Sequence, residues 1–304
     1  MKTHLVTATT LLAIGLIAGC GGGSSTPAST VPVTGKVADG YLAGATVFMD
    51  KNGNYQLDPG EPSTTTDANG NFTLTVDPAD VGQHPIVALA MAGKTIDMDT
   101  NTALANSYVL SMPAASVTAS ASGAVSGTVG NFISPVSSQL RIMMDSGNYA
   151  SVQNAMDALR TQMGLPAGTN MLADYMATNN TAMHTAAQNM ATLMGSQMSQ
   201  VMATSGTATT VDVGRYQGMM VAIFQNMSSI KGSTPNSTAM TNLMSTMTAT
   251  LQNSVSGLPF RNISSSIRGM MGSTGSSTLG VMMGVKNSAT SAGTTAGTGM
   301  MGSL

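Results

Sequence analysis

The hydrophobic pattern of this 304-residue chain changes its period once, and this change constrains the fold more than any other feature. Between residues 31 and 115, short apolar segments such as "GATVFMD" and "NFTLTVD" alternate with Gly, Asn, Asp and Pro. Such alternation, with turn residues between the segments, is typical of half-buried strands in a sandwich. From about residue 131 the apolar residues recur every three or four positions, as on one face of a helix. The sequence therefore predicts an α+β protein, a β-sandwich followed by an α-helical bundle.

The helical period is clearest in two methionine-rich segments. Asn180 is a residue type that favours the N-cap, so it is expected to cap the first of them. The apolar positions that form one face are Met183, Ala187, Met190, Met194, Met198 and Val201 in the first segment and Met240, Met244, Met247 and Leu251 in the second.

The chain contains 28 methionines, and two interpretations of them remain open. Methionine is an adaptable core residue with good helix propensity, so those at helical spacing are expected to pack a core. Thioethers are also soft ligands that select Cu(I), and "GMMG" occurs at 269–272 and again at 299–302. His84 and His184, the histidines beyond residue 20, do not lie in a metal-ligand spacing. The alternative function is therefore an envelope protein that binds copper(I).

The first twenty residues predict export. Lys2 and His4 precede the apolar run "LLAIGLIAG", which is too short to span a bilayer and is typical of a secretory signal. The run ends in "IAGC", which resembles the lipobox of bacterial lipoproteins. The resemblance implies cleavage before Cys20, a diacylglycerol on its thiol and acylation of the new amino group. The alternative is an ordinary signal peptide in which Cys20 is incidental.

Cys20 is the only cysteine, so an intramolecular disulfide is excluded and a lipid anchor explains the thiol. Two or three acyl chains hold a protein firmly on a membrane. By resemblance to enterobacterial sorting rules, Gly21 in place of Asp favours the outer membrane. The segment "GGGSSTPAST" at 21–30 has the composition of a flexible tether.

The composition and motifs argue against two broad classes of function. Charged residues make up 8% of the chain and the formal net charge is -2, so no basic stripe is available to neutralise nucleic-acid phosphates. The sequence contains no G-x-S-x-G elbow, no H-E-x-x-H and no phosphate-binding loop of the Walker type. We therefore expect neither nucleic-acid binding nor catalysis.

The stretch "DKNGNYQLDPGE" at 50–61 has the ligand spacing of a twelve-residue calcium loop. Tyr55 departs from that pattern, because it stands where the loop usually has glycine. The alternative is an ion-free turn rich in Asn, Gly and Asp, residues that favour turns for conformational reasons. The segments 67–71 and 97–101 are weaker candidates, and we interpret the first as a turn. The predicted Ca²⁺ ligands are Asp50, Asn52, Asn54, Gln56 through its backbone carbonyl, Asp58 and Glu61.

The segment from "GKVADGYLAGATVFMD" to "NFTLTV" resembles small modules of bacterial surface proteins, related to carboxypeptidase regulatory-like and collagen-binding-type B repeats. This resemblance implies an Ig/prealbumin-like sandwich that serves adhesion, spacing or presentation. "ISPVSSQL" and "HTAAQNMATLM" are similar to the helical region of uncharacterised Gram-negative lipoproteins. This resemblance implies no catalytic residues.

The resulting prediction is an outer-membrane or cell-surface lipoprotein that acts by binding, adhesion or presentation. Its partners are expected to be the membrane, through the lipid, and an envelope or extracellular protein. Weak calcium binding is expected to stabilise the sandwich. The predicted organisation is a signal peptide at 1–19, lipidated Cys20 with a tether at 20–30, the sandwich at 31–115, a linker at 116–130, the helical domain at 131–286 and a disordered tail at 287–304.

Overall fold

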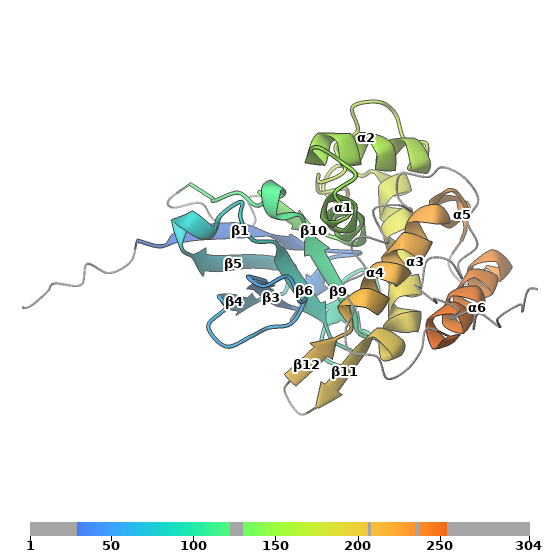
Figure 1. The fold of residues 1–304 in the computed structure, drawn as a ribbon, viewed down its shortest axis with the longest axis horizontal. Helices are drawn as coiled ribbons and strands as arrows, with labels where there is room; N and C mark the ends of the chain where they lie inside the picture. Colours follow the sequence, from blue (N-terminus) through green and yellow to red (C-terminus); the bar gives the residue numbers. More distant parts are fainter. Residues whose placement is uncertain (1–28, 122–129, 206–207, 235–236, 254–304) are drawn as a thin grey trace, which may run out of the picture.

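The computed structural model describes residues 29–121, 130–205, 208–234 and 237–253. Strands and helices both occur in these ranges, so the predicted α+β class is confirmed. Figure 1 shows the strands gathered toward one end of the long axis and most helices toward the other. The expected disordered tail at 287–304 lies outside the described residues.

One sheet has three strands in the order β10-β1-β5. Strand β1 (Val31–Val37) runs antiparallel to β5 (Asn71–Val76) and parallel to β10 (Asn131–Ile133). Gly35 allows the approach of β10, because a Cβ at this position would lie 1.9 Å from the backbone oxygen of Asn131. The Asn131 side-chain amide donates to the carbonyl of Thr34 on β1 and to the carbonyl of Thr118, which follows the strands of the second sheet in the chain.

A second sheet has four antiparallel strands in the order β4-β3-β6-β9. Its members are β4 (Ser63–Thr65), β3 (Thr46–Met49), β6 (Ile86–Ala90) and β9 (Tyr108–Met112). Every residue of β6 and β9 is buried. Continuous burial requires a cover on both faces of these strands, and helices provide part of it, since α1 and α3 pack against β9.

Smaller elements complete the strand half. A short sheet contains β2 (Leu42–Ala43), β7 (Ile96–Asp97) and β8 (Thr102–Ala103). Two 3-10 turns, η1 (Pro78–Asp80) and η2 (Ala114–Ser116), lie in connecting segments.

The helical half contains six helices in the described ranges. The helix α3 packs against α1, α4, α5 and α6 and so occupies the centre of this half. A hairpin of β11 (Met202–Ser205) and β12 (Ala208–Val211) connects α3 to α4. The helices are α1 (Pro135–Asp145), α2 (Val152–Met163), α3 (Thr181–Val201), α4 (Val213–Gln225), α5 (Met227–Gly232) and α6 (Thr238–Asn253).

The predicted start and buried face of α3 are confirmed. The Asn180 side chain accepts a hydrogen bond from the Met183 N–H at 3.1 Å, which is the predicted N-cap. In α6 the predicted positions are buried except Met244, which is half-buried. The buried α3 residues on the predicted face are Met183, Ala187, Met190, Met194, Met198 and Val201.

The strand and helical halves share one hydrophobic core. Residues 131–133 were assigned by sequence to the helical half, but they form β10 and lie beside β1, because they satisfy the open edge of that strand. Residues 202–205 and 208–211 of the same half form a hairpin rather than helix. Helix α1 is buried along residues 135–143 and lies between β9 and the other helices.

Candidate functional site

The predicted calcium loop begins with a buried carboxylate. Asp50 follows β3 and is fully buried. Its Oδ1 accepts hydrogen bonds from the backbone N–H groups of Gly53 and Asn54 at 2.9 and 3.0 Å. Its Oδ2 accepts from the Tyr55 N–H at 3.1 Å. The first predicted ligand therefore organises the backbone of the loop.

Tyr55 occupies the position at which the sequence departs from the calcium-loop pattern. Its φ of 61° is the left-handed conformation that glycine adopts easily, so the backbone follows that pattern without the glycine. A side chain there costs roughly 1–2 kcal/mol. Burial of the ring offsets this cost, since Tyr55 is fully buried with its ring centroid 4.6 Å from that of Tyr216 on α4.

The remaining predicted ligands also meet in the loop. Glu61 bonds to two parts of the loop, because its Oε1 accepts from the N–H group of Lys51 at 2.7 Å and its Oε2 accepts from that of Asp58 at 3.0 Å. The Asp58 Oδ2 accepts from the side-chain amides of Asn52 and Asn54, each at 2.7 Å.

Gln56 enters this network through its backbone, whose N–H donates to the Asn54 Oδ1 at 2.8 Å. The structure therefore joins the predicted residues of the loop, which hydrogen-bond to one another.

A cation from the helical half reaches the same loop. Arg141 on α1 is 2% exposed, and its Nη2 donates to the Asp50 Oδ2 at 2.8 Å. The guanidinium carbon lies 3.8 Å from the centroid of the Tyr55 ring, and Nε lies 3.4 Å from Asp145 Oδ2. Burial alone would lower the pKa of Arg141, but Tyr55, Asp145 and Asp50 outweigh it and raise that pKa. Arg141 is therefore a permanent buried cation, which sequence reasoning did not associate with the loop.

Arg141 changes how well the loop fits a calcium ion. Two unit charges about 4 Å apart repel by about 4 kcal/mol at an effective dielectric constant of about 20, and a divalent ion doubles that figure. An ion bound to Asp50 would lie close to the guanidinium, so the donor set fits poorly at this residue. Within the described ranges, no group of three or more His, Cys, Asp and Glu residues is arranged to hold a metal. Calcium binding stays a prediction from the sequence alone.

The two weaker candidate segments form turns. At 67–71 the Asp67 Oδ1 accepts from the N–H groups of Asn69 and Asn71 at 2.8 and 2.9 Å. At 97–101 the Asp97 Oδ1 accepts from the Asp99 N–H at 2.9 Å. The Asp99 carboxylate instead contacts α3, where it lies 2.7 Å from His184 Nε2 and accepts from Gln188 at 2.9 Å.

Sequence reasoning missed a buried carboxyl group near this contact. Asp39 accepts a hydrogen bond from the Tyr108 hydroxyl at 2.8 Å, whereas its Oδ1 has no partner in the described part of the chain. Burial raises the pKa of Asp39 to about 7, because the Tyr108 bond offsets only part of the desolvation and Asp97 and Asp99 add negative charge. The local sequence "ADG" indicates only a turn, since Tyr108 is remote in the chain.

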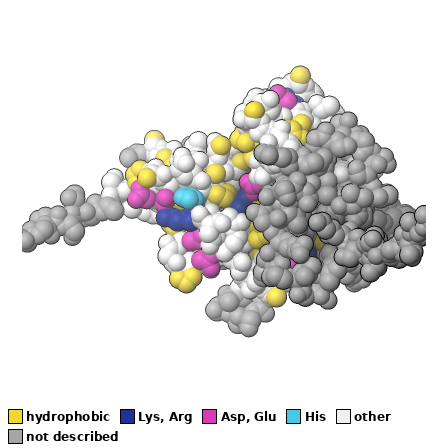
Figure 2. All heavy atoms as spheres, viewed as in Figure 1, with side chains coloured by type: hydrophobic (Ala, Val, Ile, Leu, Met, Phe, Trp, Pro, Cys, Tyr) yellow, Lys and Arg dark blue, Asp and Glu magenta, His cyan; other side chains and the backbone are white. Residues whose placement is uncertain are grey.

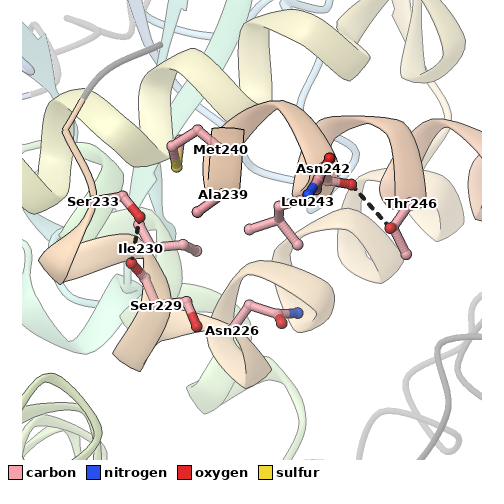
Figure 3. A pocket seen from close by; sticks show the side chains of 9 residues that line it. All are labelled: Asn226, Ser229, Ile230, Ser233, Ala239, Met240, Asn242, Leu243 and Thr246. Atoms are coloured by element: carbon pink, nitrogen blue, oxygen red, sulfur yellow. Dashed lines mark hydrogen bonds between the residues drawn. The ribbon is translucent and has the colours of Figure 1, made fainter. Parts of the chain in front are cut away.

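A pocket in the described helical half lies between α5 and α6 and has a volume of about 240 Å³. Figure 3 shows Ile230 of α5 and Leu243 of α6 pointing toward one another across it. Its lining includes amide and hydroxyl groups but no charged side chain. The residues that line it are Asn226, Ser229, Ile230, Ser233, Ala239, Met240, Asn242, Leu243 and Thr246.

Several predicted features lie outside the described residues, namely the signal segment, Cys20, most of the tether and the methionine pairs at 269–272 and 299–302. In the described ranges, no helix is long and apolar enough to cross a membrane. His84 lies 3.6 Å from Asp80, and His184 contacts Asp99 as described above.

No protein-family model matches this chain, and comparisons with curated proteins and with solved structures give no match either.

Proposed function

We propose that this chain is a lipid-anchored protein of the bacterial outer membrane that holds its helical end away from the lipid for binding. One observation carries this proposal. Strand β1, which begins at residue 31 just after the tether, starts toward one end of the long axis in Figure 1, whereas helices α5 and α6, which line the pocket, lie toward the other end. An anchor at Cys20 would therefore leave the pocket on the side remote from the membrane.

In this proposal the strand half is a spacer with an Ig/prealbumin-like sandwich fold, and the helical half is a bundle centred on α3. Contacts of β4 with β5 and of β10 with β9 support two sheets that face one another. The packing of α1 against β9 joins the spacer to the bundle. Such a joint favours a single rigid arm over two modules that move independently.

The chemistry of the pocket favours an uncharged partner group. Its lining mixes apolar side chains with the amides of Asn226 and Asn242, so it suits a group with an apolar body and a few polar atoms. Figure 2 shows charged side chains of both signs interspersed on the visible face of the strand half. Because the charges are mixed, this face carries no continuous positive potential that would attract a nucleic acid. A protein partner fits such a surface better.

The proposal can be tested by measuring distance from the membrane. Because the lipid would occupy Cys20, single fluorophores can be attached to Thr30→Cys and Ser245→Cys in vesicles that contain nitroxide-labelled lipid. We expect strong quenching at residue 30 and weak quenching at residue 245 on α6. The parent protein, which has no other cysteine, is the control and should not take up the label. Equal quenching at both positions would contradict the proposed arrangement.

The copper(I) alternative is less well supported. The methionines predicted to form the α3 face are buried in the shared core. Their sulfur atoms therefore have packing partners, and the alternative depends on the pairs at 269–272 and 299–302, outside the described residues.

A further inference from the structure

The buried charge of Asp50 requires a positive partner. A carboxylate removed from water is costly unless it is paired and hydrogen-bonded. The N–H groups of Gly53, Asn54 and Tyr55 supply three hydrogen bonds but no net charge. In a calcium loop of this spacing, the metal ion would supply the positive charge.

Arg141 supplies the charge in this structure. The residue lies on α1, 91 positions from Asp50 in the chain, and reaches the carboxylate at 2.8 Å. The Tyr55 ring covers one face of the guanidinium, a favourable cation–π contact. The left-handed backbone at Tyr55 brings this ring to Arg141, so the one departure from the calcium-loop pattern coincides with the cation.

The other loop carboxylates already have partners. Glu61 accepts from the N–H groups of Lys51 and Asp58, and Asp58 accepts from the amides of Asn52 and Asn54. These hydrogen bonds connect the loop residues to one another without an external ligand.

We propose that the Arg141 guanidinium takes the place that a calcium ion has in a loop of this spacing. The loop at 50–61 is then a calcium-type loop with an internal cation, and it fastens α1 to the β3–β4 connection. Its stability is independent of external calcium. This inference does not depend on the proposed function as a lipid-anchored binding protein, because it concerns contacts within the chain.

The test compares the parent full chain with the variant Arg141→Met. Methionine is also unbranched at this position but carries no charge. Melting temperatures and calcium binding are measured in chelator and in about 5 mM calcium, above the roughly 0.1–1 mM dissociation constants of extracellular modules. We expect identical melting curves for the parent in both conditions. The variant should melt at a lower temperature in chelator and recover part of the loss in calcium.

Three further variants serve as matched controls. Arg141→Met combined with Glu61→Gln should lose the calcium recovery, because the final carboxylate of the loop is neutralised. Arg141→Lys keeps a cation and should not respond to calcium. Asp50→Asn combined with Arg141→Met removes both charges, so this variant should fold without calcium even if Arg141→Met folds only with it.

Two results would overturn the inference. Stoichiometric calcium binding by the parent, with a rise in its melting temperature, would show that Arg141 does not replace the ion. Failure of calcium to restore any stability or folding to Arg141→Met would show that the loop lacks the properties of a calcium loop.

Discussion

At the scale of single residues, Asp39 shows how the fold sets the chemistry of a side chain. Its carboxyl group is buried, only one of its oxygens is hydrogen-bonded, and Asp97 and Asp99 add negative charge nearby. Each of these factors except the Tyr108 bond favours the protonated form, and the pKa is raised from 3.8 to about 7. Ionisation of Asp39 therefore opposes the native state.

This shift predicts the sign of a pH dependence. A raised folded-state pKa gives stability that is full below about 3.8 and is lost as the pH rises toward about 7. At 1.36 kcal/mol per pKa unit, the loss is at most about 4 kcal/mol. Asp39→Asn keeps an oxygen that can accept the Tyr108 hydrogen bond but cannot ionise, so the decline between pH 4 and 7 should become shallower. Urea unfolding across this window measures the slope.

The comparison between parent and variant isolates Asp39. Glu61 and Asp145 also have raised pKa values, with burial as the main cause, and they contribute slopes of the same sign to both proteins. Equal slopes in the parent and in Asp39→Asn would contradict the assignment.

Individual residues also show why the site could be predicted only in part. The spacing of acidic and amide side chains located the loop at 50–61, because the groups that shape a turn lie within a few residues of one another. The partners Arg141 and Tyr216 belong to α1 and α4, so no local pattern could reveal them. Asp39 was missed for the same reason, since its partner Tyr108 is 69 positions away.

At the scale of elements, the periodicity of α3 predicted its buried face, because a helix of this length presents a repeating pattern to the core, and the residue type of Asn180 predicted its cap. The strand β10 has only three residues, too few to show an alternation. The hairpin of β11 and β12 was also missed, since its pairing is not visible as a hydrophobic period. Short elements depend on their neighbours more than on their own sequence.

The buried α3 methionines give a prediction at this scale. Replacement of Met190, Met194 and Met198 by Leu nearly conserves volume and apolarity, so each change should cost less than about 1.5 kcal/mol. Urea unfolding measures the stability, and competition with a Cu(I) chelator measures metal affinity. We expect a folded triple variant whose copper affinity equals that of the parent.

Met98 provides a matched control for these substitutions. This residue is 39% exposed, so Met98→Leu removes a thioether without changing the core. A folded triple variant that lost a stoichiometric Cu(I) affinity present in both the parent and the Met98 variant would show that the α3 sulfur atoms bind metal.

At the scale of the whole molecule, α1 joins the two halves. It packs against β9, α2, α3 and α4, and its Arg141 reaches the loop that follows β3. The change in hydrophobic period marks the boundary between strands and helices in the chain, but it carries no information about how the two halves pack. A division at 131 would also remove β10 from the sheet that contains β1.

The last prediction concerns the attachment of this unit to the membrane. Cys20→Ala removes the only thiol to which a lipid could be joined, so the folded part should retain its stability while the protein leaves the membrane. Fractionation of cells that express the parent or the variant measures the distribution. The control is the melting temperature of the folded part in the parent and in Cys20→Ala, because equal values would exclude a loss of structure in the variant. A variant that remained in the membrane fraction after a salt wash would refute the lipid anchor and leave Cys20 without a role in attachment.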